Sequence, residues 1–343
     1  MPILKANAYG HGLVECARLF ENEGAPYLGL AYLEEAMRLR DQGIVTPILV
    51  MGGILGSQIP LFIGHDLTLT ASSIDKLRAI DEVAAAMGST AKVHLKIDTG
   101  MERIGTHWYS ASSLLEASLT CKHIEVEGIY SHFANADDAD LTHARLQLER
   151  FQEVLDFYPS HGLPTPIRHM ANSGAILQLV ASHLDMVRPG ICLFGVYPSR
   201  HVARSIEILP ALSWKSRVVY FKVVRPNSPI SYGSAWQSDH QVRVVTVPVG
   251  YGDGYQRRMS GKAEVIIDGE RHPVVGRICM DQIMVNIEWG TAYNGDEVLL
   301  LGEQGGVSVR AEELAEWADT IPYEILCGIN TRVPRTYVDS GAR

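Results

Sequence analysis

The chain has 343 residues, of which 46% are hydrophobic and 20% charged, and its formal net charge is -9 at pH 7. This length suits two domains, or one large barrel with a smaller companion, and the composition is that of an ordinary soluble globular protein. The acidic balance argues against a nucleic-acid or anionic-membrane surface, because both require concentrated Lys and Arg.

The five cysteines lie far apart and are odd in number, which argues against a disulfide framework or a zinc cluster. They favour a reducing compartment. The first residues lack the charged and apolar pattern of an export signal, and no run approaches the ~18 apolar residues of a membrane span. We therefore expect a cytoplasmic protein that does not insert into a membrane and has no metal site.

Short apolar or β-branched runs alternate with amphipathic stretches through the first part of the chain. We expect strands at 2–5, 27–32, 47–51, 67–71, 92–97, 126–133, 167–171 and 186–194. Between them, apolar residues recur at intervals of three and four in 33–43, 73–88 and 141–158, which is typical of helices. Eight strands with helical crossovers predict a (β/α)8 barrel over 1–209 rather than an open doubly wound sheet.

The pattern changes near Leu209. Strand-like segments separated by turns follow, and among them only 309–320 is typical of a helix. Asp268-Gly269 between two apolar runs is a strong hairpin signal. We therefore predict a smaller, mostly antiparallel β domain over 210–343.

Polar residues collect where the predicted barrel strands end, which is where (β/α)8 barrels carry their chemistry. They are Lys5, Lys96, Asp98, Arg103, His132, Asn135, His169, Asn172, Ser173 and Arg188. A lone lysine at a strand end is usually a solvated surface residue, and a lone buried histidine is usually a satisfied core residue. Several such ends on one rim favour an active site.

Two segments predict an anion site. Ala-Asn-Ser-Gly at 171–174 opens a helix after strand seven, and Arg-Pro-Gly-Ile at 188–191 lies in strand eight. Barrel phosphate sites commonly use these loops and the N–H groups of a helix start, although a plain Asn cap is the competing interpretation. A rim lysine beside a phosphate site points to pyridoxal phosphate held as a Schiff base on Lys5.

At this point the sequence resembles the alanine racemases. The resemblance begins with Lys-Ala-Asn-Ala-Tyr-Gly-His-Gly at 5–12 and continues in order to the end of the chain. The further blocks are LKIDTGMERIG (95–105), SHFANAD (131–137), HMANSGA (169–175), MVRPGI (186–191), ISYGSAW (230–236), VGYGDGY (249–255), VGRICMDQ (275–282) and RVPR (332–335). It implies a pyridoxal phosphate-dependent enzyme that interconverts L- and D-alanine and, in bacteria, supplies D-alanine for peptidoglycan.

The resemblance implies two acid–base groups on opposite faces of the substrate, Lys5 and Tyr232. In the family this tyrosine comes from the partner subunit, so a homodimer with shared active sites is implied. Free tyrosine ionises near pH ~10, so Tyr232 can act as a base only if a neighbour stabilises its phenolate or exchanges a proton with it. His169 would be that neighbour, and His169 would in turn contact Arg188. Arg188 would also face the pyridine nitrogen and, having only donors, leave it without a full proton, which restrains side reactions.

The resemblance also implies supporting roles. Cofactor contacts would come from Tyr9, His132, Asn172, Ser173, Gly190, Ile191 and Tyr323, and the substrate pocket from Arg103, Tyr251, Met280 and Asp281. Lys96 would orient Arg103, and in many family members the corresponding lysine is carbamylated. An ordinary Lys96 would repel Arg103, whereas a carbamate would accept its hydrogen bonds.

One departure concerns the start. Family members generally carry a few tens of residues before the lysine motif, contributing a strand to the second domain and a barrel helix, and here the lysine is residue 5. We expect a chain without them to be poorly soluble or weakly dimeric. Restoring such a segment and comparing melting temperature and dimer affinity tests this.

Three alternatives remain. A racemase of another or broader specificity, such as serine, would share every catalytic residue. A pyridoxal phosphate-binding barrel without turnover would lack the β domain, so Tyr232 and Met280-Asp281 argue against it. A two-domain decarboxylase would use a carboxylate opposite the pyridine nitrogen and a cysteine block that this sequence does not contain.

Overall fold

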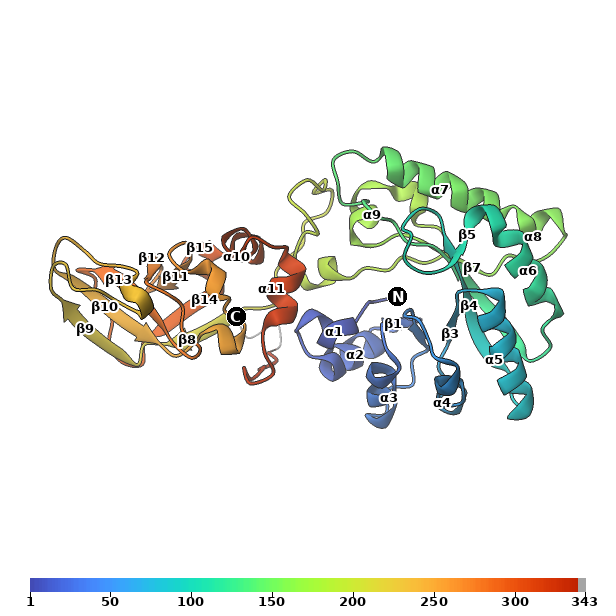
Figure 1. Ribbon diagram of the computed structural model, residues 1–343, viewed down its shortest axis with the longest axis horizontal. Coiled ribbons are helices and arrows are strands. Elements are labelled where there is room, and N and C mark those ends of the chain that lie inside the picture. Colours follow the sequence, from blue (N-terminus) through green and yellow to red (C-terminus); the bar gives the residue numbers. More distant parts are fainter. Residues whose placement is uncertain (339–343) are drawn as a thin grey trace. The chain divides into compact units, whose positions relative to one another are not determined.

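The computed structural model describes residues 1–338. The chain forms two compact units (Figure 1). The first unit comprises Met1–Leu193 with Tyr197–Glu207, and the second comprises Phe194–Val196 with the chain from Ile208 onward. We describe each unit by itself.

The first unit is a closed barrel of parallel strands. Its strands are β1 (Leu28–Leu30), β2 (Ile48–Val50), β3 (Leu69–Ala71), β4 (Ala91–Asp98), β6 (Ile124–Tyr130) and β7 (Ile167–His169). β1 pairs with β2, and β3, β4, β6 and β7 pair in that order, all parallel. Single parallel bridges at Ile3, Leu49 and Met186 link the remaining neighbours. The Ile3 N–H donates to Pro189 O at 2.9 Å, and this bond closes the ring.

The predicted (β/α)8 barrel is confirmed, but its first and eighth strands are shorter than expected. Residues 2–5 contribute one bridge, between Ile3 and Gly29, and residues 186–194 contribute one, between Met186 and His169. Lys5 therefore does not end a strand, because it begins the short helical turn α1 (Lys5–Tyr9). Similarly, a 3-10 turn at Ile191–Phe194 replaces the end of the expected eighth strand.

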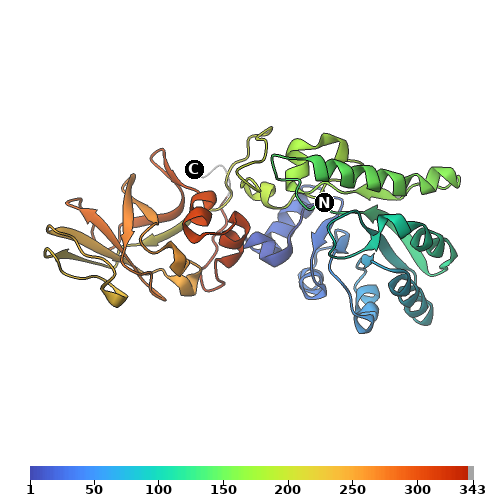
Figure 2. The same cartoon turned by 45° about the horizontal axis from the view of Figure 1, so that its top comes forward.

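Helices surround the strands (Figures 1 and 2). They are α2 (Leu13–Asn22), α3 (Leu33–Asp41), α4 (Ile59–Gly64), α5 (Ile74–Ala86), α6 (Ala111–Thr120), α7 (Thr142–Leu155), α8 (Phe157–Ser160) and α9 (Ser173–Gln178). The expected helices at 33–43, 73–88 and 141–158 correspond to α3, α5 and α7. In α5, Ser73 caps the first turn and Leu77, Ile80 and Ala84 are buried. No helix within residues 1–338 is long and apolar enough to cross a bilayer.

Polar residues alternate with apolar residues along β4, and the polar side chains point into the barrel. Val93, Leu95 and Ile97 are fully buried apolar residues, and between them stand His94 and Lys96. Successive side chains of a strand point to opposite faces, so the two polar residues share one face. This face is the barrel interior, because His94 contacts His169 of β7 across it.

The second unit is built on an antiparallel sheet. Its order is β15 (Val307–Val309), β14 (Glu297–Gln304), β11 (Glu264–Ile267), β12 (Glu270–Val275), β13 (Ile283–Glu288), β10 (Val242–Val247) and β9 (Tyr220–Val224), and β8 (Trp214–Arg217) also pairs with β14. The Asp268-Gly269 hairpin is confirmed: Ile267 pairs with Glu270, and both turn residues have positive φ, 49° and 76°. The helix predicted at 309–320 is α10 (Ala311–Ala318), and the sequence analysis missed α11 (Pro322–Gly328).

Candidate active site

Strand register places three side chains in one row inside the barrel. Lys96 of β4 is the partner of Tyr130 of β6, and Tyr130 is the partner of His169 of β7. The Tyr130 ring stacks on His169 with centroids 4.8 Å apart and planes 6° apart, and Lys96 Nζ lies 4.7 Å from the Tyr130 centroid. The sequence analysis gave Tyr130 no role, because only the strand register shows that it lies beside His169.

Arg188 joins this row from the neighbouring segment. Its side chain is 3% exposed. Nη1 donates to His169 Nδ1 at 3.0 Å, and Nη2 lies 3.0 Å from His132 Nδ1 and donates to the carbonyls of Ser131 at 2.7 Å and Met170 at 3.0 Å. The expected contact between His169 and Arg188 is therefore present, and His132 belongs to the same cluster.

The cluster is kept free of extra positive charge. Burial lowers the pKa of Arg188 to about 10, which still leaves it protonated at neutral pH. Burial, followed by the charge of Arg188, holds the pKa values of His132 and His169 well below the usual 6.5. All the acceptors around Arg188 are therefore neutral.

His169 uses both ring nitrogens within the barrel. Nδ1 faces Arg188, and Nε2 lies 2.8 Å from Nδ1 of His94, a second fully buried histidine that the sequence analysis did not single out. The expected link from Tyr232 to His169 therefore stays a prediction, and it would need one of these two contacts to change.

The surroundings of Lys96 favour loss of its proton. Its side chain is 4% exposed, and burial together with the charge of Arg188 lowers its pKa well below 10.5. Asp98, two residues on, organises the following loop: it accepts N–H groups from Gly100, Met101, Glu102 and Arg103. Burial alone would raise the pKa of Asp98, but these hydrogen bonds outweigh it and lower the pKa. The same loop carries Arg103, whose side chain is exposed.

Lys5 lies at the start of a left-handed turn. The four residues after it, 6–9, have φ values of 53°, 58°, 52° and 52°, so α1 is a left-handed turn built from non-glycine residues. Asn7 Oδ1 accepts the Leu13 N–H at 2.9 Å, and Glu35 Oε1 accepts the Ala6 N–H at 2.7 Å. These two bonds hold a conformation that costs ~1–2 kcal/mol per residue.

The same turn brings Tyr9 to the predicted phosphate site. A Cβ added to Gly190 would lie 2.5 Å from the Tyr9 hydroxyl, so glycine is what lets this hydroxyl approach the main chain. Ser173 Oγ accepts N–H groups from Gly190 at 3.0 Å and Cys192 at 3.4 Å. The Tyr9 and Ser173 hydroxyls and the backbone N–H groups of Gly190 and Cys192 thus lie together, with Ile191 fully buried beside them, and a phosphate there would replace Ser173 Oγ as the acceptor of these N–H groups. Asn172 instead caps α9 by accepting the Ala175 N–H at 3.0 Å.

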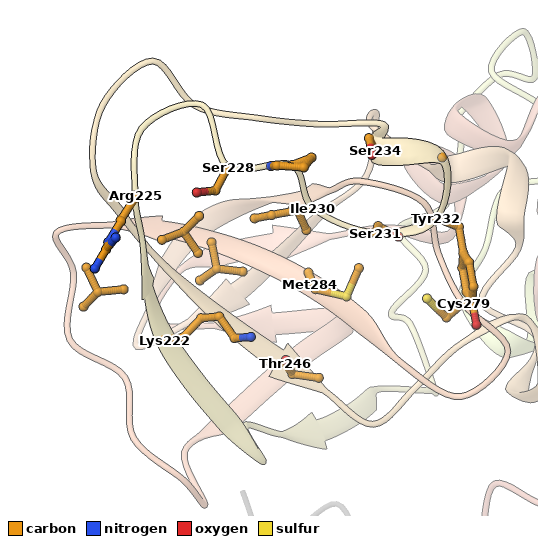
Figure 3. A pocket seen from close by; sticks show the side chains of 15 residues that line it. Lys222, Arg225, Ser228, Ile230, Ser231, Tyr232, Ser234, Thr246, Cys279 and Met284 are labelled. Atoms are coloured by element: carbon orange, nitrogen blue, oxygen red, sulfur yellow. The ribbon is translucent and has the colours of Figure 1, made fainter.

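Tyr232 lies in the second unit on a 3-10 turn, Tyr232–Ser234, and is 69% exposed. Positive φ values of 68° at Ser231 and 70° at Gly233 turn the chain sharply on both sides of it. It lines a cavity of about 860 Å³, together with residues of β9, β10 and β13 (Figure 3). Figure 3 shows Tyr232 and Cys279 at the same end of this cavity.

The predicted substrate-pocket residues of the second unit, Tyr251, Met280 and Asp281, lie on two loops that hydrogen bonds join. The Tyr251 N–H donates to Cys279 O at 3.0 Å, and the Gly252 N–H donates to Met280 O at 2.9 Å. Arg332 bonds both Asp253 and Asp281 at 2.6 Å, which ties one loop to the other. The sequence analysis gave no role to Arg332. Tyr323 lies in α11, and its phosphate contact stays a prediction.

Comparison with known families gives two matches that together span almost the whole chain. Residues 1–198 match the alanine racemase N-terminal domain, and residues 211–337 match the alanine racemase C-terminal domain. Among curated relatives, alanine racemase 2 of Caldanaerobacter subterraneus subsp. tengcongensis is 42% identical over 99% of this chain and 88% of its own. The alanine racemase of Carboxydothermus hydrogenoformans is 44% identical over 98% of this chain and 92% of its own.

Solved structures agree. The alanine racemase of Clostridium difficile 630 has a TM-score of 0.92 at 39% identity, covering 99% of this chain and 88% of that one. A histidine racemase from Leuconostoc mesenteroides subsp. sake has a TM-score of 0.90 at 31% identity, covering 99% of this chain and 91% of that one. With both domain models matched in order and close relatives over the full length, the chain belongs to the alanine racemase family.

Proposed function

We propose that the chain is a pyridoxal phosphate-dependent alanine racemase that interconverts L- and D-alanine. The observation that carries the proposal is Arg188, an arginine rather than a carboxylate, held by four acceptors inside a barrel of this family. A donor-only group at this place supports proton exchange at the α-carbon over competing cofactor chemistry.

The residues of the first unit fit the cofactor. Tyr9, Ser173 and the backbone at Gly190 and Ile191 would hold its phosphate, while Lys5 would hold it covalently between turnovers. Asn172 would contribute indirectly by capping the helix that begins with Ser173. Bound there, pyridoxal phosphate withdraws electron density from the α-carbon of an amino acid and makes its C–H bond acidic.

Racemisation needs two proton carriers on opposite faces of one carbon. Lys5 takes or returns the α-proton on one face, and the hydroxyl of Tyr232 does so on the other. Arg103 binds the substrate carboxylate, and Lys96, once carbamylated, orients Arg103 by accepting its N–H groups. Tyr251, Met280 and Asp281 close the pocket around a side chain as small as a methyl.

We infer that the working enzyme is a homodimer in which Tyr232, Tyr251, Met280 and Asp281 serve the partner's Lys5. Exposure supports this: Tyr232, Met280 and Tyr251 are 69%, 53% and 42% exposed on the second unit. Large exposed side chains at predicted site positions are those that a partner subunit would cover. We also infer a cytoplasmic enzyme, since no disulfide joins the five cysteines, which all lie within residues 1–338, and a role in supplying D-alanine for peptidoglycan.

The first test is chiral analysis of L-alanine incubated with the protein and pyridoxal phosphate in deuterium oxide. We expect D-alanine with deuterium at the α-carbon, and its loss in both Lys5→Ala and Tyr232→Phe. A protein that binds the cofactor but forms no D-alanine would contradict the proposal. A panel including L-serine and L-histidine measures side-chain selectivity, because the fold also occurs in a histidine racemase.

Mixing the two inactive variants tests the shared sites. In a mixed dimer one site carries both substitutions, and the other combines an intact Lys5 with an intact Tyr232. Random reassortment makes about half of the dimers mixed, each with one working site, so we expect about one quarter of wild-type activity. No recovery after verified subunit exchange would place both residues of each site in one subunit.

A further inference from the structure

His94 is a buried polar residue for which the proposed reaction has no direct use. It is fully buried inside the barrel, and its register partner on β6 is Gly128, in the row next to that of Lys96, Tyr130 and His169. Its Nδ1 lies 2.8 Å from His169 Nε2, and its own Nε2 is buried without a hydrogen-bond partner among residues 1–338. Only one of the two ring nitrogens of His94 is hydrogen-bonded, and this arrangement needs a physical reason in a buried histidine.

The direction of each hydrogen bond in this chain follows from Arg188. A guanidinium only donates, so Nδ1 of His169 must accept the bond from Nη1. A neutral imidazole has one donor and one acceptor, so Nε2 of His169 carries the proton and donates to Nδ1 of His94. The proton of His94 then lies on its Nε2. The reverse direction would require His169 to accept at both nitrogens, which a neutral ring cannot do.

The site is shaped for this ring. A Cβ added to Gly128 would lie 2.5 Å from Nδ1 and Cε1 of His94, so glycine makes the space in which the imidazole lies. The ring of Tyr27 lies 5.5 Å away by centroids and that of Tyr130 lies 6.4 Å away. Packing on these sides confines the ring, and the hydrogen bond with His169 Nε2 places Nδ1 on the side that faces His169.

The charges around the pair disfavour a second proton. The positively charged guanidinium of Arg188 is bonded to His169. On the other side, the Glu127 carboxylate accepts hydrogen bonds from Tyr27 and Thr68. Burial, followed by the charge of Arg188, lowers the pKa of His94 to about 3. Both imidazoles therefore stay neutral where the enzyme would work.

We propose that His94 is a positioning residue that fixes His169 in its Nε2–H tautomer and thereby fixes the plane of the Arg188 guanidinium. This rests on the proposed function, in which Arg188 faces the cofactor. One consequence concerns Tyr232: while His94 occupies Nε2, His169 has no nitrogen free to take a proton from that tyrosine. Stabilisation of a Tyr232 phenolate would then come from the positive charge of Arg188 acting through space.

Nitrogen-15 NMR of histidine-labelled protein tests the tautomers directly. We expect His94 and His169 both to be neutral, with protons on Nε2, in cofactor-free protein and in holoenzyme. A proton on Nδ1 of His94, or an imidazolium signal from either ring at neutral pH, would overturn the proposal. The measurement on cofactor-free protein is independent of turnover, so its outcome is separable from that of the racemase assay.

Two substitutions separate hydrogen bonding from space filling. His94→Leu keeps the approximate volume of the side chain but removes the hydrogen-bond acceptor. His94→Asn keeps an acceptor, Oδ1. We expect His94→Leu to lower kcat at least about tenfold, to change KM less than about threefold, and to shift the visible absorption band of bound pyridoxal phosphate. We expect His94→Asn to retain kcat to within about threefold, because Oδ1 can still accept from His169.

The matched control is His123→Leu, directly before β6, where the side chain is 43% exposed, and it should behave like wild type. Wild-type kcat and absorption in His94→Leu would show that His94 only fills space. Equal losses in His94→Leu and His94→Asn would show that the acceptor is irrelevant. If neither variant folds, the tautomers of the wild-type protein decide the question.

Discussion

Gly190 controls how close the Tyr9 hydroxyl comes to the predicted phosphate cradle. Any side chain there would meet this hydroxyl at 2.5 Å and the attached ring carbon at 3.1 Å. Both atoms are confined, because Tyr9 is 7% exposed and sits in a left-handed turn. The turn that positions Lys5 and the cradle that would hold the phosphate therefore share one side chain.

We expect Gly190→Ala to destabilise the first unit by ~1–3 kcal/mol through overpacking and to weaken pyridoxal phosphate binding. A thermal melt and a fluorescence titration with the cofactor measure the two effects. Gly64→Ala is the matched control, because a Cβ there meets nothing within 4 Å. Unchanged cofactor affinity in Gly190→Ala would remove Gly190 from the predicted cradle.

Lys96 is predicted to carry a carbamate. Only an unprotonated amine adds to CO2, and burial with the charge of Arg188 lowers the pKa of Lys96 well below 10.5. We expect native mass spectrometry to find one added CO2 per chain, and activity to fall when CO2 is removed and to recover with bicarbonate. Lys96→Ala should mainly raise KM, because Arg103 loses its orienting partner. A mass that never changes with bicarbonate would contradict this.

The left-handed turn α1 shows what a sequence pattern could not predict. The apolar run before Lys5 predicted a strand ending at the lysine, and the nearest glycines, which tolerate positive φ, are Gly10 and Gly12. In the structure the turn starts five residues before Gly10 and uses Ala, Asn and Tyr at positive φ. Residue preference disfavours this conformation, and what fixes it is tertiary: the Glu35 carboxylate, distant in sequence, accepts the Ala6 N–H.

Relieving this strain should raise stability. Ala6 is exposed with φ of 53°, so we expect Ala6→Gly to raise the free energy of unfolding by up to ~1 kcal/mol, because glycine adopts this region without steric cost. Ala85→Gly, an exposed alanine in the last turn of α5, is the control and should destabilise by a similar amount. Equal destabilisation by both would show that residue 6 carries no backbone strain.

The sequence predicts elements that have a strong hydrophobic periodicity or a clear turn signal. It does not predict elements that single tertiary contacts define. The helix patterns of α3, α5 and α7 and the Asp268-Gly269 hairpin could be predicted because local chemistry decides them. The eighth strand could not, because Met186 makes only one bridge and Arg188 is held by side-chain and carbonyl acceptors. Likewise, Tyr130 and His94 become site residues only through the strand register that places them beside His169.

Acid stability is a property of the first unit as a whole. His94, His132 and His169 have folded pKa values lowered below 6.5, by burial and then by Arg188, so the unfolded chain takes up protons before the folded barrel does. Stability should be full above pH ~6.5 and fall as the pH decreases below it, by up to ~1.4 kcal/mol per pH unit for each histidine.

Thermal melts from about pH 7.5 to about pH 5, followed by far-UV circular dichroism of the helix-rich first unit, measure this dependence. His94→Leu should flatten it, because one proton fewer is taken up on unfolding. His240 is a contrast: the hydrogen bonds that its ring donates to Glu288 and Asp239 raise its pKa, so its replacement should have no such effect. A melting temperature independent of pH in wild type would show that folding does not lower the pKa values of the three histidines.

The barrel is closed by the bond between Ile3 and Pro189, which joins segments nearly the length of the unit apart. Lys5 follows one of these residues by two positions, and Gly190 follows the other directly. Contacts of such high sequence separation form late in folding, because the entropy of loop closure must be overcome first. Lys5 and the predicted phosphate site would therefore come together only when the Ile3–Pro189 hydrogen bond closes the barrel. A partly folded barrel should then be unable to bind the cofactor, and bound cofactor should slow the reopening of the barrel between Ile3 and Pro189.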